Sequence, residues 1–159
     1  MSSSKPLEWK SGSETDTQAA GARLARAAFK IQPAFIRLTG PLGAGKSALA
    51  RGFIKEWLSL SGEPSPESIV SPTYNIVKMY GAKSALAHLD LYRLGSLREL
   101  EQLGYEHYFF ELQCCLVEWL EQVPEVLPMV PPYAIQVEIE FSAKDSERVI
   151  RVRSSTKIS

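Results

Sequence analysis

The sequence GPLGAGKS at Gly40–Ser47 matches the pattern G-x-x-x-x-G-K-[S/T] at every fixed position. The residues before it, AFIRLT at 34–39, are mostly apolar and prone to form a β-strand. Residues 48–58 place apolar side chains at helical spacing, which predicts a helix that continues to about Leu60. A strand, a glycine-rich loop and a helix in this order predict a phosphate-binding loop.

The chemistry of such a loop follows from its residue types. Glycines lack Cβ atoms, so backbone N–H groups can turn inward around a phosphate. The free N–H groups and the dipole at the start of the next helix also favour an anion. Lys46 supplies a positive charge for the β- and γ-phosphates, and Ser47 offers a hydroxyl to Mg²⁺. A chance match in a plain glycine-rich turn is the alternative, and the flanking elements argue against it.

The composition is that of a globular chain without a strong net charge. The chain has 159 residues, 45% of them hydrophobic, so we expect one domain spanning residues 1–159 with a sizeable core. The 18 basic and 18 acidic side chains cancel. This balance argues against autonomous binding of DNA or RNA. Binding of nucleic acid would then need a local basic surface or a partner protein.

Cys114 and Cys115 are the two cysteines of the chain and are adjacent in an apolar run. Neighbouring strand residues point to opposite faces, so we expect free, buried thiols in a reducing compartment. No apolar run approaches the roughly 18 residues of a membrane span. The polar N-terminus also lacks a signal-peptide core. These features favour a soluble cytoplasmic protein without a membrane partner.

The rest of the chain alternates helical and strand patterns. Helices are predicted at residues 15–29, 96–103 and 105–111. Strands are predicted at residues 69–70, 75–80, 85–91, 114–117, 133–141 and 148–153. Residues 1–12 are expected either to be flexible or to contain a short edge strand near Leu7.

Two pairs of these strands can form antiparallel hairpins. One pair is 75–80 with 85–91, and the other is the C-terminal strand pair within 133–153, joined across the Lys144-Asp145 turn. Strands joined through helices pair in parallel. We therefore predict an α/β, three-layer P-loop NTPase-like fold, whose mixed sheet has a parallel core and antiparallel edge strands.

A phosphate-binding loop needs an acidic partner for Mg²⁺ and for the attacking water. Glu118 follows the apolar run CLV at 115–117 and is the first candidate, and Asp90 in a more mixed strand is the second. For each, an ordinary surface carboxylate is the alternative. Ser71 and Thr73 lie between the loop and these acids, where a nucleotide-sensing switch segment or a plain turn is expected.

A set of motifs in this chain resembles the TsaE family, the small P-loop ATPases of bacterial tRNA threonylcarbamoyladenosine synthesis. In order, the motifs are GAGKS at 43–47, SPTY at 71–74, HLDLYRL at 88–94, Glu99-Leu100 with Gly104, and LVEW at 116–119. The loop alone is widespread, whereas this combination is specific to the family. The resemblance is close over residues 15–119 and weaker in the C-terminal strand pair.

The resemblance implies roles for the matching residues. Asp90 and Glu118 match the family's two essential acids, and we assign Glu118 near the metal and Asp90 as the Walker-B-like acid, with their division of roles open. The expected nucleotide-binding residues are Gly40, Leu42, Gly43, Ala44, Gly45, Lys46, Ser47, Ala48 and Trp119. The expected metal ligands are Ser47, Asp90 and Glu118, and the expected catalytic residues are Lys46, Thr73, Asp90 and Glu118.

The resemblance also implies an activity and partners. Family members bind ATP or ADP with Mg²⁺, hydrolyse ATP weakly alone and act with the proteins TsaB and TsaD. Threonylcarbamoyl transfer would then belong to TsaD, and contact with tRNA would be indirect, through the complex. A small-molecule kinase is one alternative, although no Arg-rich lid of about 20 residues precedes Glu118. A nucleotide-dependent binding module without turnover is the other.

Three residues depart from the family pattern, and one of them is Arg98, which stands where an acid is usual. Pro41 stands where the family often has Asp, and it lacks an N–H for the phosphate cradle. Ala48 stands where a second hydroxyl is common. His88, Tyr92 and Arg93 match the family's H-x-D-x-Y-R pattern and are implied to shape the site or a partner face. The residues that read the base, the oligomeric state and the partner interface stay open.

Overall fold

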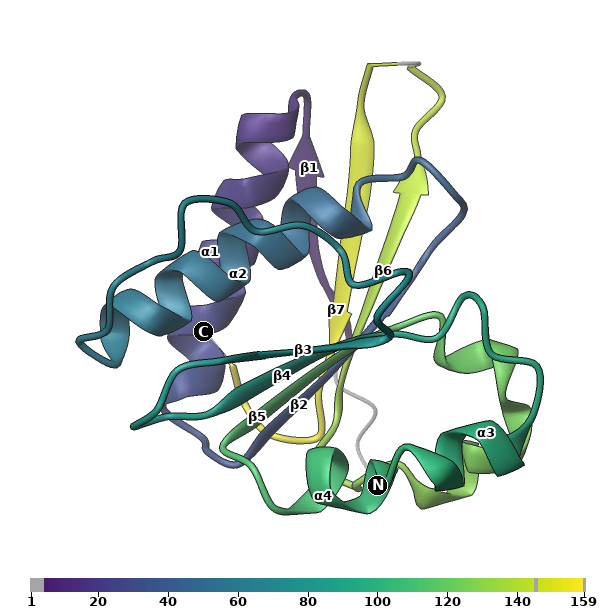
Figure 1. The fold of residues 1–159 in the computed structure, drawn as a ribbon. Coiled ribbons are helices and arrows are strands. Elements are labelled where there is room, and N and C mark those ends of the chain that lie inside the picture. Colours follow the sequence, from purple (N-terminus) through teal and green to yellow (C-terminus); the bar gives the residue numbers. More distant parts are fainter. Residues whose placement is uncertain (1–4, 145, 159) are drawn as a thin grey trace.

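The computed structural model describes residues 5–144 and 146–158, which form a mixed β-sheet with helices on both faces (Figure 1). The strands are β1 (Leu7–Ser11), β2 (Ala34–Thr39), β3 (Val77–Tyr80), β4 (Leu86–Asp90), β5 (Cys114–Glu118), β6 (Ile135–Phe141) and β7 (Arg148–Arg153). The helices are α1 (Glu14–Phe29), α2 (Lys46–Leu60), α3 (Leu97–Gln102) and α4 (Tyr105–Phe110), with 3-10 helices η1 (Leu120–Gln122) and η2 (Pro124–Met129).

The centre of the sheet is parallel and its edges are antiparallel. Across the sheet the order is β1-β7-β6-β2-β5-β4-β3. β2 pairs in parallel with β5 and β6, and β4 pairs in parallel with β5. The outer pairs β3–β4, β6–β7 and β1–β7 are antiparallel. The predicted fold class is therefore confirmed, and so are the two predicted hairpins.

This topology gathers the predicted site at one edge of the sheet. Parallel strands end at the same edge, and in open α/β sheets ligands bind outside the carboxyl ends of the strands. The phosphate-binding loop follows β2, Asp90 ends β4 and Glu118 ends β5. The three features come from stretches far apart in the sequence, and the pairing of β2, β5 and β4 brings them together.

Each face of the sheet has its own apolar core, because the central strands are buried on both sides. Ile36 belongs to the cluster under α1 and α2, whereas Phe35 belongs to the cluster under α3 and α4. Cys114 and Cys115 divide between the two faces in the same way. Both cysteines are free and buried, as predicted. Figure 1 shows the resulting three layers, with α1 and α2 on one side of the sheet and α3 and α4 on the other.

Glycines allow α1 and α2 to cross at very short distance. A Cβ on Gly52 of α2 would overlap the carbonyl oxygen of Gln18 in α1. A Cβ on Gly21 of α1 would in turn overlap the carbonyl oxygen of Leu49 in α2. The reciprocal contact holds α2, and with it the phosphate-binding loop at its start, against the first half of α1.

The strand predicted at residues 69–70 is wrong. Ile69 lies in irregular backbone, with its side chain 4% exposed in the core and its carbonyl accepting a hydrogen bond from Arg51 Nε at 3.0 Å. Val70 is exposed. A single buried side chain thus anchors this loop, and an apolar pair after a proline-rich loop does not require a partner strand.

Other expectations concern loops and chain ends. Of the two alternatives for residues 1–12, the edge strand is present as β1, and residues 1–4 lie outside the described residues. The turn predicted at Lys144-Asp145 includes Asp145, which also lies outside them. After β5, residues 120–122 and 124–129 form η1 and η2. No helix in the described ranges has both the length and the apolar character needed to cross a membrane.

Candidate nucleotide-binding site

The phosphate-binding loop connects β2 to α2 as predicted. Gly45 directly precedes α2 with a φ of 112°, a left-handed conformation that glycine adopts without the steric cost of a Cβ. A Cβ on Gly40 would overlap the carbonyl oxygen of Ile139 in β6, so this position also requires glycine. The unpaired N–H groups of the first turn of α2 belong to residues that line a pocket, where they can receive an anion.

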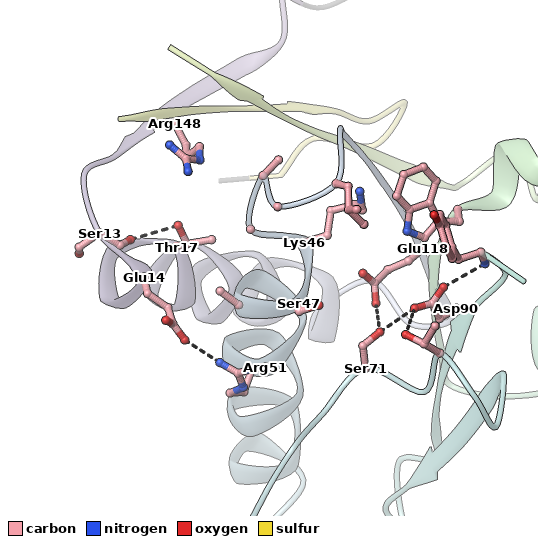
Figure 2. Close-up of a pocket in the computed structure, with 18 of the residues that line it drawn as sticks. Ser13, Glu14, Thr17, Lys46, Ser47, Arg51, Ser71, Asp90, Glu118 and Arg148 are labelled. Atoms are coloured by element: carbon pink, nitrogen blue, oxygen red, sulfur yellow. Dashed lines mark hydrogen bonds and ion pairs between the residues drawn. The ribbon is translucent and has the colours of Figure 1, made fainter. Parts of the chain in front are cut away.

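A pocket of about 560 Å³ lies over the loop (Figure 2). Its lining comes from the loop and α2, from the segment 71–73, from the ends of β4 and β5, and from the starts of α1 and β7. The lining residues are Ser13, Glu14, Thr17, Leu42, Gly43, Ala44, Gly45, Lys46, Ser47, Ala48, Arg51, Ser71, Thr73, Asp90, Tyr92, Glu118, Trp119, Ser146 and Arg148. The volume is within the usual range for small-molecule sites.

Lys46 is the buried cation of the pocket, with 6% of its surface exposed. Its Nζ donates to the carbonyl oxygens of Gly40 and of Pro41, the latter at 3.3 Å, and lies 3.9 Å from the centre of the Trp119 ring. Burial lowers the pKa of Lys46, and the negative charges of Glu118, Glu121 and Asp90 oppose this shift. The ammonium group is therefore poorly hydrated. Its present acceptors are the carbonyl oxygens of Gly40 and Pro41, and phosphate oxygens could take their place.

Asp90 and Glu118 form a pair of buried carboxylates, 3% and 2% exposed. The Ser71 hydroxyl lies 2.8 Å from Asp90 Oδ2 and 3.0 Å from Glu118 Oε2, and Figure 2 shows it between the two acids. Asp90 also accepts hydrogen bonds from the Thr73 hydroxyl at 2.8 Å and from the Tyr92 N–H at 3.0 Å. The predicted acids and the predicted switch hydroxyls therefore form one hydrogen-bonded cluster.

Trp119 has an unusual backbone conformation that serves this arrangement. Its φ is 61°, which a bulky L-residue adopts at a steric cost. Consecutive residues of a regular strand point to opposite faces, yet Glu118 and Trp119 both line the pocket. The Trp119 ring contacts the Lys46 ammonium and lies 5.0 Å from the Tyr92 ring. The turn at the end of β5 thus brings two neighbouring side chains to the same cavity.

The donor set in the pocket fits Mg²⁺. No cluster of three or more His, Cys, Asp or Glu side chains that could hold a metal ion occurs in residues 5–144 and 146–158. Mg²⁺ does not need such a cluster, because it is commonly held by one or two carboxylates, by water and by substrate phosphates. Ser47, Asp90 and Glu118 supply hard oxygen atoms to one cavity, beside the loop that would hold the phosphates.

The structure brings nearly all predicted site residues to this pocket. Each predicted nucleotide-binding residue other than Gly40 lines it, together with Thr73, Asp90 and Glu118. Gly40 does not line the pocket, but its carbonyl accepts a hydrogen bond from Lys46. The Arg93 guanidinium instead lies 4.8 Å from the centre of the Tyr74 ring.

The sequence patterns did not identify the wall formed by the starts of α1 and β7. Ser13 caps α1, since its side chain accepts a hydrogen bond from the Asp16 N–H at 3.1 Å. Arg148 is predicted only as a strand residue. The pairing of β1 with β7 sets Ser11 opposite Arg148 and so brings these stretches together. The polar run SGSETDT at 11–17 is the one signal that points to this wall.

Comparisons with known proteins identify the family of the chain. A family model described as "Threonylcarbamoyl adenosine biosynthesis protein TsaE" matches residues 11–150. A tRNA threonylcarbamoyladenosine biosynthesis protein TsaE from Bacillus subtilis is 36% identical over 147 residues, covering 92% of this chain and 84% of that protein. Its namesake from Haemophilus influenzae is 37% identical over 124 residues, covering 77% of this chain and 72% of that protein.

A solved structure is similar over nearly the whole chain. The crystal structure of YdiB from Bacillus subtilis matches with a TM-score of 0.70 at 29% identity, covering 96% of this chain and 87% of that one. The motifs that resemble TsaE all lie within the matched residues 11–150. The chain belongs to the TsaE family of tRNA threonylcarbamoyladenosine biosynthesis proteins.

Proposed function

We propose that the chain is a P-loop ATPase domain that binds ATP with Mg²⁺ and hydrolyses it to ADP and phosphate during tRNA threonylcarbamoyladenosine formation. The observation that carries this proposal is the position of two buried acids, Asp90 and Glu118, in the same cavity as the phosphate-binding loop. A phosphate loop alone binds nucleotide, whereas hydrolysis also needs groups that hold Mg²⁺ and orient water.

The loop and Lys46 bind the phosphates. Backbone N–H groups at the start of α2 surround the phosphate oxygens, with one donor fewer at Pro41. Lys46 exchanges the carbonyls of Gly40 and Pro41 for phosphate oxygens, which carry a full negative charge and therefore bind the ammonium more strongly. The poor hydration of Lys46 favours this exchange, because little water must be removed from the ammonium.

Ser47, Glu118 and Asp90 hold Mg²⁺ and orient the attacking water. When bound, Mg²⁺ neutralises the charge that develops on the β- and γ-phosphates. We assign Glu118 to the metal, and its charge also acts on the Lys46 ammonium. Asp90 has the Walker-B-like role and connects the site to the segment with Ser71 and Thr73. That segment can therefore respond to the occupancy of the site.

The activity serves other proteins of the pathway. We propose TsaB and TsaD as the partners, with TsaD carrying the threonylcarbamoyl transfer and this chain resetting the complex through hydrolysis. The balance of 18 basic and 18 acidic residues supports indirect contact with tRNA, through the assembled complex. The proposed location is the cytoplasm, where tRNA is modified.

The test is ATP turnover by the purified chain, alone and with TsaB, TsaD and tRNA. We expect slow turnover alone, stimulation by the partners, and loss of both in Lys46→Ala and Glu118→Ala. A small-molecule kinase would instead phosphorylate an added small acceptor. A binding module without turnover would show no stimulation and no loss of function in the two variants. Either result would contradict the proposal.

A further inference from the structure

The buried histidine of β4 makes a contact that hydrolysis alone does not explain. His88 Nε2 lies 2.7 Å from Glu118 Oε2, and the two side chains are 1% and 2% exposed. His88 is not among the residues that line the pocket, whereas Glu118 is. Any influence of His88 on the site therefore passes through Glu118.

Packing alone does not account for a histidine at this position. His88 Nδ1 is buried and has no hydrogen-bond partner among the described residues. A buried polar atom without a partner destabilises a fold. An apolar side chain of similar size would avoid this cost, since Leu86, which points to the same face of the sheet, and Leu116, opposite His88 in β5, are both core residues. The Nε2 contact to Glu118 is what the imidazole provides.

Glu118 has a second donor, but that donor is shared. Ser71 Oγ lies 3.0 Å from Glu118 Oε2 and 2.8 Å from Asp90 Oδ2, and one hydroxyl has only one proton to donate. Ser71 also belongs to an irregular segment, whereas His88 lies within the sheet, opposite Leu116 of β5. Of the two donors to Oε2, only His88 stays in place when Ser71 turns to Asp90 or the segment moves.

We propose that His88 is a positioning residue that holds Glu118 Oε2 through its Nε2–H, so that the carboxylate keeps one orientation toward the pocket whatever the position of Ser71. Both contacts converge on Oε2, and Oε1 carries neither of them. Oε1 is therefore the oxygen available for Mg²⁺ or its bound water. This inference rests on the proposed function, which assigns Glu118 to the metal and water.

His88→Gln and His88→Asn distinguish this role from a packing role, because both introduce a side-chain amide and differ only in its reach. The amide nitrogen of Gln in His88→Gln can occupy the place of imidazole Nε2 and donate to Glu118, whereas that of Asn in His88→Asn is too short to reach it. We expect His88→Asn to lower kcat for ATP roughly 10- to 100-fold, as for other residues that orient a metal ligand. We expect His88→Gln to recover most of this loss. Binding of ADP in EDTA should stay within about twofold in both, since the loop is untouched.

A spectroscopic measurement tests the contact without ATP hydrolysis. His88 and the exposed His107 are the two histidines of the chain, so ring ¹⁵N NMR of labelled protein resolves them. We expect His88 to show the Nε2–H tautomer, and Glu118→Ala to shift its ring resonances while His107 stays unchanged.

If the wild type hydrolyses no ATP with or without partners, the proposed function fails, while the NMR result still decides whether His88 contacts Glu118.

Any of three outcomes would overturn the inference. The first is a kcat of His88→Asn equal to that of the wild type, with a melting temperature that shows a folded protein. The second is an unchanged His88 spectrum in Glu118→Ala. Equal losses of kcat in His88→Asn and His88→Gln, with equal losses of thermal stability, would likewise assign His88 to packing and reject the positioning role.

Discussion

Asp90 of β4 and Glu118 of β5 are direct partners across the parallel sheet, so two buried carboxylates end neighbouring strands side by side. Like charges this close destabilise each other unless a cation or shared hydrogen bonds compensate. The Ser71 hydroxyl lies within hydrogen-bonding distance of both. The loop that carries Ser71 thus makes a polar contact with both acids of the site.

Ser71→Ala should destabilise the protein when Mg²⁺ is removed. Loss of the hydroxyl leaves two buried carboxylates with one donor fewer, which costs about 1–3 kcal/mol. The measurement is urea unfolding in EDTA, with Ser65→Ala, at an exposed position of the same loop, as the control. The control should stay within about 0.5 kcal/mol of the wild type. Equal stability of the two variants would mean that the shared contact does not hold the acids.

Lys46→Met should raise thermal stability at neutral pH while abolishing nucleotide binding. Burial lowers the pKa of Lys46 below 10.5, which means that the folded state disfavours the charged ammonium. The folded protein then binds fewer protons than the unfolded chain between the lowered pKa and 10.5, so wild-type stability rises with pH across that window. The advantage of Lys46→Met should therefore shrink as pH approaches 10.5.

The matched control for this substitution is Lys55→Met, because Lys55 lies in the same helix but is exposed. Melting temperatures of both variants would be compared at neutral pH and just below pH 10.5. A Lys46→Met variant that is less stable than the wild type at neutral pH would reject the prediction, because it would show that the buried ammonium stabilises the fold.

Gly52→Ala should destabilise the protein, although the same change in an exposed helix usually stabilises it by about 1 kcal/mol. The added Cβ would overlap the carbonyl oxygen of Gln18, so α1 and α2 would have to separate. Overpacking of this kind costs typically about 1–3 kcal/mol. Gly12→Ala is the control, because its Cβ would meet only the Asp16 carboxylate, at 3.6 Å. Urea unfolding that finds both variants equally stable would argue against the close crossing.

Much of this architecture could be predicted from local sequence patterns. The phosphate-binding loop, the buried strand before Glu118 and the alternating strands at the C-terminus all follow from glycine chemistry and from the spacing of apolar residues. The burial of Cys114 and Cys115 on opposite faces follows from the two-residue period of a strand.

Other features depend on contacts between distant parts of the chain. The strand predicted at residues 69–70 is wrong because a short apolar run can equally anchor a loop, as Ile69 does. The pocket wall near Ser13 and Arg148 arises from the β1–β7 pairing, which joins the two ends of the described chain. The left-handed backbone of Trp119 is set by its surroundings, since tryptophan has no preference for it.

The most direct test of the proposed ATPase activity compares single-turnover ATP hydrolysis by the wild type, Glu118→Gln and the control Glu125→Gln, whose carboxylate is exposed. Glutamine retains an oxygen that accepts from His88 but loses the charge, so we expect ATP binding to persist. Hydrolysis by Glu118→Gln should fall roughly 10²- to 10⁴-fold, the range for loss of a group that moves a proton, while Glu125→Gln should match the wild type. Equal hydrolysis by all three proteins would contradict the assignment of Glu118 to the metal and water.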